Sequence, residues 1–344
     1  MIEAKMIADS IGQHSPRLLT IRAVSPKFIH QETLRHRLIY IEDALRGDPD
    51  FSFSVSSARA IPFKKLLEEV RSDELRAVPV KWGAEQKGMS PGDELDDIHK
   101  SVDWFLGSDD DGNNPAWESI TFREAARREW RQAALTAAAA AERMTAIGVH
   151  KSIVNRVIEP YIHCHALMTA TAPGWLNFFG LRLDGGADPT VRALAEACWV
   201  VWNESEPKLL RPGEWHLPFV NEDDLQEKDW SDNPISYHIK VSVARCARLT
   251  FNSFETGKIS TIEEDLKLYD RLVGSVPLHA SPAEHIAAPD TKKQMLISSV
   301  NGDTGIYDYA WNKQHLHGNL PGWQQYRKML PGEALAPIPT EYAR

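Results

Sequence analysis

Arg35-His36-Arg37, followed by Phe51-Ser-Phe-Ser-Val-Ser-Ser-Ala-Arg59, is the stretch on which the prediction of the fold depends. The first segment is basic, and the second is rich in hydroxyl groups and ends in arginine. A guanidinium group can hold a phosphate through two parallel hydrogen bonds, while serine hydroxyls and loop amides occupy the remaining lone pairs. The two segments therefore predict a cradle for an anion, although a solvated basic helix end can have the same composition.

The length and composition of the chain are those of an ordinary globular protein. Its 344 residues suit one large or two modest domains, with 42% hydrophobic and 25% charged residues. A net charge of −9 argues against a general nucleic-acid partner, so phosphate affinity is expected only in a local basic pocket. The sequence has no signal-peptide pattern and no apolar run of about 18 residues, so we expect a cytoplasmic protein without a membrane partner.

The cysteines and histidines predict neither disulfides nor a metal site. Cys164, Cys198 and Cys246 are far apart and lack CxxC spacing, which indicates a reduced compartment. His163 and His165 could share one face of a strand, but no third ligand is evident. We therefore expect packed or surface histidines and no catalytic thiol.

Capping signals predict three helices. Thr121-Phe-Arg-Glu124 opens a long helix with a stripe of small apolar residues, which ends at Gly148. Asp188-Pro189 opens the second, and Thr261-x-x-Glu264 opens the third. Other expectations are strands at 18–24 and 239–244, helices at 28–38 and 62–70, a polar loop at 83–117, and no long periodic element after 286.

Six segments taken together resemble the flavin-dependent thymidylate synthases. They are Phe28–Arg37, Phe53–Arg59, Asn155-Arg-Val-Ile-Glu-Pro160, Asn177-Phe-Phe-Gly-Leu-Arg182, Ala244-Arg-Cys-Ala-Arg-Leu-Thr-Phe251 and His279-Ala-Ser-Pro-Ala-Glu-His285. Neither the GxGxxG fingerprint nor the GxxxxGK[ST] loop occurs, so a flavin would need a cradle of another kind.

The order of these segments predicts a circular permutation. The last two segments come first in the common form of the family, whereas here they follow the others. The resemblance implies one permuted catalytic domain over 1–344, of the α/β (α+β) class, with long helices against a mixed sheet. Its expected parts are 1–82, a loop insertion at 83–118, a helical segment at 119–203, a connector at 204–236, a motif segment at 237–290 and an irregular tail at 291–344.

The resemblance implies transfer of a one-carbon unit from methylenetetrahydrofolate to C5 of dUMP. FAD, reduced by NADPH, would supply the hydride, so the protein would need no cysteine nucleophile. The family also implies a homotetramer with active sites between subunits.

Residue roles follow from the same resemblance. The catalytic set is Ser57, Arg182 and His279, with Arg182 stabilising negative charge at N3 of the uracil ring. The nucleotide set is Glu32, Arg35, Ser56, Ser57, Arg59, Arg156 and Arg182. The cofactor set is Arg35, His36, Arg37, Thr171, Asn177, Thr250, Ser281 and Glu284.

The chain also departs from the family pattern. Nineteen residues lie between Arg37 and Ser57, where the family has a short spacer, and Val55 replaces a glutamate. Two alternatives therefore stay open. One is an enzyme that releases another product, such as 5-hydroxymethyl-dUMP, and the other is a non-catalytic protein that binds a nucleotide or flavin.

Overall fold

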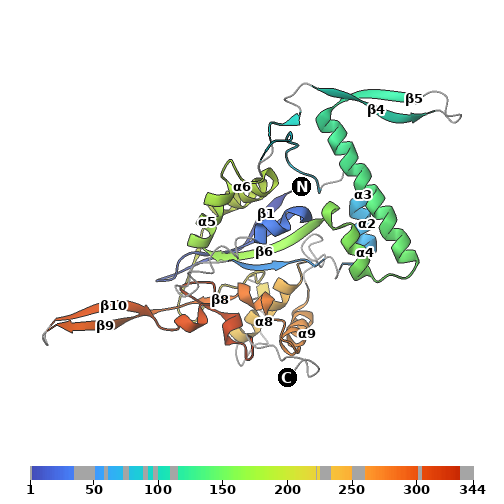
Figure 1. Cartoon of the computed structure of the whole chain (residues 1–344). Coiled ribbons are helices and arrows are strands. Elements are labelled where there is room, and N and C mark those ends of the chain that lie inside the picture. The colour runs from blue at the N-terminus through green and yellow to red at the C-terminus, as the bar shows by residue number, and fades with distance from the viewer. Residues whose placement is uncertain are drawn as a thin grey trace, which may run out of the picture.

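The structure has a central sheet with helices on both faces and two hairpins that extend away from the body (Figure 1). This computed structural model describes residues 2–34, 51–57, 61–72, 77–87, 92–95, 100–108, 115–221, 223–224, 234–249, 260–300 and 304–333. The mixed α/β class predicted from the sequence is confirmed. Five predicted site residues lie outside the described residues, namely Arg35, His36, Arg37, Arg59 and Thr250.

The central sheet has the strand order β3–β6–β2–β1–β7. Its strands are β1 (Glu3–Gly12), β2 (Leu18–Pro26), β3 (Ser52–Val55), β6 (His163–Thr171) and β7 (Lys208–Leu210). All neighbours pair antiparallel except β7, which runs parallel to β1, so the sheet is mixed as expected. Because Pro26 pairs with His163 and Val55 with Ala166, β2 and β3 both end where β6 begins.

One face of the sheet is covered by α5 (Ala172–Arg182) and α6 (Pro189–Glu204). Alternate residues of β2, among them Leu19 and Ile21, pack there against Trp175, Phe178 and Leu194. The Asp188 side chain accepts hydrogen bonds from the amides of Thr190 and Val191, so the predicted N-terminal cap of α6 is confirmed.

The opposite face is covered by the C-terminal unit, by which we mean α8 (Pro234–Ala247), α9 (Ile262–Val273), η6 (Ser281–His285) and η8 (Tyr326–Met329). Leu167 of β6 joins a buried cluster with Val243 and Ala283 of this unit and with Ile286, which follows η6. The predicted capping box of α9 is present, with Thr261 and Glu264 bonded reciprocally. The unit thus belongs to the same body as the sheet, although the circular permutation itself stays a prediction.

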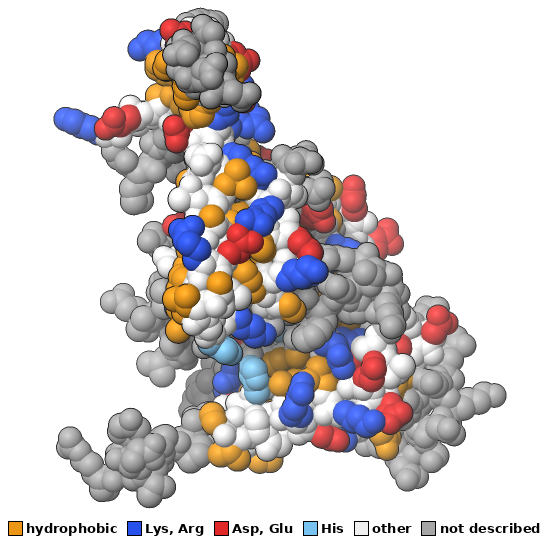
Figure 2. All heavy atoms as spheres, turned by 90° about the vertical axis from the view of Figure 1, so that its right-hand side faces the viewer, with side chains coloured by type: hydrophobic (Ala, Val, Ile, Leu, Met, Phe, Trp, Pro, Cys, Tyr) orange, Lys and Arg blue, Asp and Glu red, His pale blue; other side chains and the backbone are white. Residues whose placement is uncertain are grey.

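A second helical layer lies beside the sheet. It consists of α2 (Phe63–Arg71), α3 (Phe122–Ala146) and α4 (Lys151–Val157). Ala134, Ala138 and Ala141 of α3 are buried in the hydrophobic cluster that these three helices share. Figure 2 shows this side of the molecule, where basic, acidic and hydrophobic side chains are mixed. The Thr121 hydroxyl accepts from the amide of Glu124, but the Glu124 carboxylate bonds Arg128 instead of completing the box.

The predicted strand at 239–244 is wrong, because this segment lies within α8. Ile239, Val241 and Val243 alternate with polar residues, which is the pattern of a strand. Nearly every side chain from His238 to Cys246 is buried, however, so the helix has no polar face that would reveal its period.

The predictions of an unstructured loop at 83–117 and an irregular tail after 286 are wrong in part. Both regions contain a hairpin, formed by β4 (Ser101–Ser108) with β5 (Pro115–Thr121) and by β9 (Lys292–Val300) with β10 (Thr304–Trp311). A register shift interrupts each ladder, so alternation with a period of two is broken in the sequence. The remaining short elements are η1 (Lys27–Ile29), α1 (His30–Leu34), η5 (Glu159–Tyr161), β8 (Ala287–Pro289), η7 (Gln314–Leu316) and β11 (Trp323–Gln325).

Within the described residues, no helix combines the length and apolar character needed to cross a membrane.

Candidate nucleotide site

The predicted nucleotide residues of the described chain lie toward one end of the sheet, where β2 and β3 end and β6 begins. We call this region the nucleotide end, and it comprises Glu32, Ser56, Ser57, Arg156 and Arg182. The sequence brings them there because α1 follows β2, α4 and η5 precede β6, and α5 runs back along the sheet from the far end of β6.

The two serines that follow β3 have different roles. The Ser56 hydroxyl accepts a hydrogen bond from the amide of His165 at 3.0 Å, and the Ser56 amide donates to the His165 carbonyl at 2.9 Å. Ser56 is buried and extends the β3–β6 ladder, whereas Ser57 is exposed. Ser57 is therefore the serine that remains open to a ligand.

Arg182 joins the end of α5 to α1. Its Nη2 donates to the carbonyl oxygen of Glu32 at 3.2 Å, across 150 residues of sequence. The Glu32 side chain has a buried oxygen, Oε2, with no hydrogen-bond partner in the described part of the chain. Buried polar atoms are nearly always paired, so this orphaned acceptor suits a donor group of a ligand.

Arg156 is exposed on α4, but its neighbour Asn155 is buried. Asn155 Nδ2 donates to the carbonyl of Ile61 at 3.0 Å, which fixes the chain two residues after Arg59. The sequence did not single out Asn155 as an anchor, because its partner is 94 residues away. His30 of α1 was also missed. Burial, assisted by nearby Lys27, lowers its pKa to about 4, so it is neutral near pH 7.

The cofactor residues that the structure describes, Thr171, Asn177, Ser281 and Glu284, are not gathered at the nucleotide end. Thr171 ends β6, six residues beyond His165, which corresponds to about 20 Å of strand. The Thr171 hydroxyl is buried without a partner among the described residues, which fits a residue that bonds a ligand. Asn177 is exposed on α5.

Ser281 and Glu284 belong to η6 of the C-terminal unit, and His279 lies in the loop before η6. His279 is exposed, Ser281 is half-buried and Glu284 is buried. The Glu284 carboxylate forms an ion pair with Arg327, which also pairs with Glu333. Glu284 therefore already has a cationic partner, so its predicted bond to FAD would have to compete with Arg327. The described residues show no hydrogen bond or ion pair among the predicted catalytic residues Ser57, Arg182 and His279.

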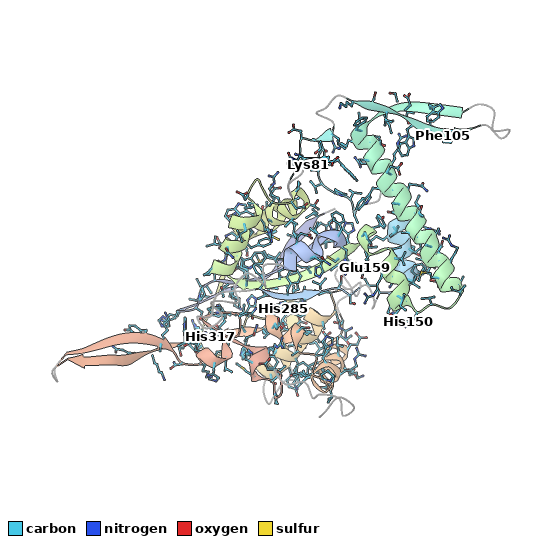
Figure 3. The ribbon with its side chains drawn as sticks, viewed as in Figure 1. Lys81, Phe105, His150, Glu159, His285 and His317 are labelled. Atoms are coloured by element: carbon cyan, nitrogen blue, oxygen red, sulfur yellow. The ribbon has the colours of Figure 1, made fainter. Side chains whose placement is uncertain are left out.

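A hydroxyl–imidazole chain crosses the sheet on the side of the C-terminal unit, where Figure 3 labels His285. Its five contacts run Ser10–His216 (2.9 Å), His216–Thr20 (2.8 Å), Thr20–Thr169 (2.6 Å), Thr169–His285 (2.8 Å) and His285–Ser54 (2.8 Å). The chain links β1, β2, β6 and β3 to η6. It holds the His279–His285 segment against the strand that leads to Ser56 and Ser57, 231 residues away.

Burial lowers the pKa of His216 to about 3, so this ring is neutral in the folded protein. A neutral imidazole donates through one nitrogen and accepts through the other, which is what a place between two hydroxyl groups requires.

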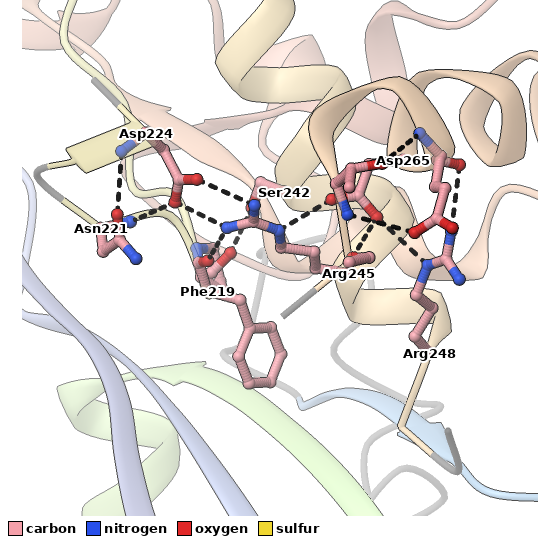
Figure 4. A network of polar contacts seen from close by, with 11 residues as sticks. Phe219, Asn221, Asp224, Ser242, Arg245, Arg248 and Asp265 are labelled. Atoms are coloured by element: carbon pink, nitrogen blue, oxygen red, sulfur yellow. Dashed lines mark hydrogen bonds and ion pairs between the residues drawn. The ribbon is translucent and has the colours of Figure 1, made fainter. Parts of the chain in front are cut away.

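The arginines of the Ala244–Phe251 segment are held by carboxylates (Figure 4). The Arg245 side chain is 3% exposed and binds Asp224 through two nitrogens, at 2.6 and 2.9 Å. Its Nε binds Asp265 at 2.9 Å, and Arg248 Nε lies 3.1 Å from the same carboxylate. Burial alone would raise the pKa of Asp224, but the bonds from Arg245 outweigh it and lower the pKa. These arginines therefore stabilise the C-terminal unit.

The cysteines do not form a reactive site. All three are buried, and burial raises the pKa of each thiol, to about 12 for Cys198. His163 bonds Glu69, and His317 bonds Asp290. The described residues contain no group of three or more side chains placed to hold a metal ion.

No protein-family model and no curated protein matches this chain. Among solved structures, it is similar to two of the UMP/dUMP methylase PolB from Streptomyces cacaoi, bound with 5-Br UMP and with 5-Br dUMP. The first is 15% identical with a TM-score of 0.37, covering 59% of this chain and 89% of that one. The second is 14% identical with a TM-score of 0.39, covering 59% and 90%. These scores are too low to support a conclusion about this chain.

Proposed function

We propose that this chain is an enzyme that transfers a one-carbon unit from methylenetetrahydrofolate to C5 of dUMP. When bound, FAD reduced by NADPH would supply the hydride for this transfer. The proposal rests on the six motif segments together with the way the described segments are arranged in space.

One contact carries the proposal more than any other, the hydrogen bond from Arg182 to the Glu32 carbonyl. It brings the Asn177–Arg182 segment to the helix that precedes Arg35-His36-Arg37, and the side chain of the same Glu32 has a buried carboxylate oxygen without a partner among the described residues. A permanent cation and an unsatisfied acceptor can together bind a uracil ring, which offers both carbonyl acceptors and an N–H donor.

Each residue at this end would have a distinct task. Arg182 would stabilise the negative charge that develops on the ring when N3 loses its proton, because a nearby cation favours the charged form. Ser57 and Arg156 are exposed and would bind the phosphate. Asn155 and Ser56 would hold the surrounding backbone in place.

A second copy of the chain is part of the proposal. Thr171 lies about 20 Å of strand from the nucleotide end, so within one copy this described cofactor residue does not meet the described nucleotide residues. In a homotetramer, the cofactor residues of one subunit could meet the nucleotide end of another. Sedimentation velocity would test this, since a monomer at micromolar concentration would contradict it.

The alternative product has one observation in its favour. Val55, at the position of the family's glutamate, packs against the hydrophobic cluster on the α5–α6 face of the sheet. A carboxylate that the family provides is therefore replaced by an apolar group, which would change how the reaction is completed. Release of 5-hydroxymethyl-dUMP is the second candidate.

The test uses dUMP labelled with tritium at C5. Incubation with FAD, NADPH and methylenetetrahydrofolate should release tritium, and the product mass should distinguish a methyl from a hydroxymethyl group. Arg192→Ala is the matched control for Arg182→Ala, because among the described residues this arginine pairs with Glu196 alone, on the surface of α6. Absence of both tritium release and flavin binding at saturating FAD would refute the proposal.

A further inference from the structure

A cavity lies between the end of β2, α6 and the first turns of α3. Its volume is about 380 Å³, within the roughly 300–1,000 Å³ typical of small-molecule sites. It is lined by Ile2, Pro26, Val78, Pro79, Val80, Trp82, Arg123, Arg127 and Ala193. None of these residues belongs to the predicted nucleotide or cofactor sets.

Hydrogen bonds hold the wall formed by residues 78–82. The Val80 amide donates to Thr190 Oγ1 at 3.2 Å, which ties the wall to α6. The Trp82 amide donates to Glu94 Oε1 at 3.0 Å, and the Trp82 ring lies 6.0 Å from that of Trp130. Figure 3 shows Lys81 of this wall between α6 and the N-terminal part of α3. The cavity is therefore formed before any ligand arrives.

The charged side chains that line this cavity among the described residues are both arginines. Arg123 and Arg127 are four residues apart on α3 and so lie on the same side of the helix. Glu94 lies 3.6 Å from Arg123 Nε, whereas Arg127 is exposed and forms no hydrogen bond or ion pair with the described residues. Glu118 and Glu124, the neighbouring acids, both pair with Arg128. These pairings leave Arg127 without a carboxylate partner among the described residues.

We propose that this cavity binds a small organic anion with a flat apolar body. The apolar side chains and the face of Trp82 would contact the body, and Arg127, with Arg123 beside it, would bind the carboxylate or phosphate head group through paired hydrogen bonds. The proposal is independent of the proposed reaction.

The probe is 2-naphthoate, titrated into the full-length protein by calorimetry, with 2-naphthalenemethanol as its uncharged counterpart. We expect 2-naphthoate to bind more tightly than the alcohol, and Arg127→Gln to weaken it about tenfold or more. Arg143→Gln is the matched control, since Arg143 is exposed at the other end of α3. Comparison with 2-naphthyl phosphate would show which head group is preferred.

Two results would overturn the proposal. Equal binding of 2-naphthoate and the alcohol would mean that the arginines do not select an anion. Unchanged 2-naphthoate binding in Arg127→Gln relative to the native chain would place the binding site elsewhere. Because Arg127 is exposed, the variant should fold, and a thermal unfolding curve checks this.

Discussion

The nucleotide end and the C-terminal unit contain similar residue types, but their motif residues differ in whether the protein already supplies their partners. In the C-terminal unit, Arg245 is enclosed by two carboxylates and His285 is bonded at both ring nitrogens. At the nucleotide end, Ser57 and Arg156 are exposed, and a buried oxygen of Glu32 has no partner among the described residues. Motif residues with partners stabilise the fold, whereas motif residues without them are available to a ligand.

The largest effect expected from this comparison is on Arg245. Arg245→Ala would leave Asp224 and Asp265 buried without their main cation, and breaking a buried pair in this way typically costs about 3–5 kcal/mol. We expect the free energy of unfolding, measured in urea, to fall by about that amount. Arg271→Ala, an exposed arginine on α9, is the control and should change it by less than about 0.5 kcal/mol.

A stable Arg245→Ala protein that had lost only nucleotide binding would contradict the comparison, because it would make Arg245 a ligand residue.

Substitution of Arg182 should lower turnover, whereas substitution of Arg245 should lower stability. Arg182→Ala should lower turnover of dUMP by roughly a hundredfold, or about 3 kcal/mol, because a preorganised donor to the developing charge is lost. Arg182→Lys should restore only part of it, since lysine keeps the charge but not the planar fork. Reduction of FAD by NADPH should survive in both variants, because that half-reaction does not require an ionised base.

The structural control for this prediction is circular dichroism of each variant. Near-normal turnover in Arg182→Ala would make the contact with Glu32 purely structural and remove the main support for the proposed function.

The hydroxyl–imidazole chain should make stability depend on pH. The folded pKa of His216 is about 3 and the unfolded value about 6.5, so the unfolded state binds more protons between these values. Stability is therefore complete above about pH 6.5 and decreases as the pH falls, by about 2 kcal/mol at pH 5. His216→Gln should remove this part of the slope, as measured by urea unfolding at several pH values. His279→Gln, at an exposed histidine, should keep the slope of the native chain.

Local signals made much of the fold predictable. The caps at Thr261 and Asp188 were found because their partners lie within a few residues. The strand predicted at 239–244 was wrong because an enclosed helix has no polar face, and the pattern of the chain then gives no period to detect.

The site was less predictable, because partners come from distant parts of the chain. Arg245 finds Asp224 inside the segment predicted as a connector, 21 residues away, and that segment also supplies β7 and His216. Nothing local to an arginine tells whether a carboxylate of the protein or a phosphate of a ligand will bind it. The resemblance placed Ser56 and Ser57 together in the nucleotide set, with Ser57 also in the catalytic set, and only the pairing of β3 with β6 shows that Ser56 is held by the fold.

These adjacent serines give the smallest and most selective test. Ser56→Ala removes the acceptor for the buried amide of His165 and should lower the free energy of unfolding by about 1 kcal/mol. Ser57→Ala removes an exposed hydroxyl and should leave stability within about 0.5 kcal/mol of the native value. The effect of Ser57→Ala should appear instead as a KM for dUMP raised roughly fivefold to tenfold, because one hydrogen bond from a neutral hydroxyl to the phosphate is lost. The same chemical change at two neighbouring positions controls for composition and side-chain size. If Ser57→Ala lowers stability and leaves KM unchanged, exposure at the nucleotide end does not indicate a ligand contact, and the distinction between the two regions fails where it is sharpest.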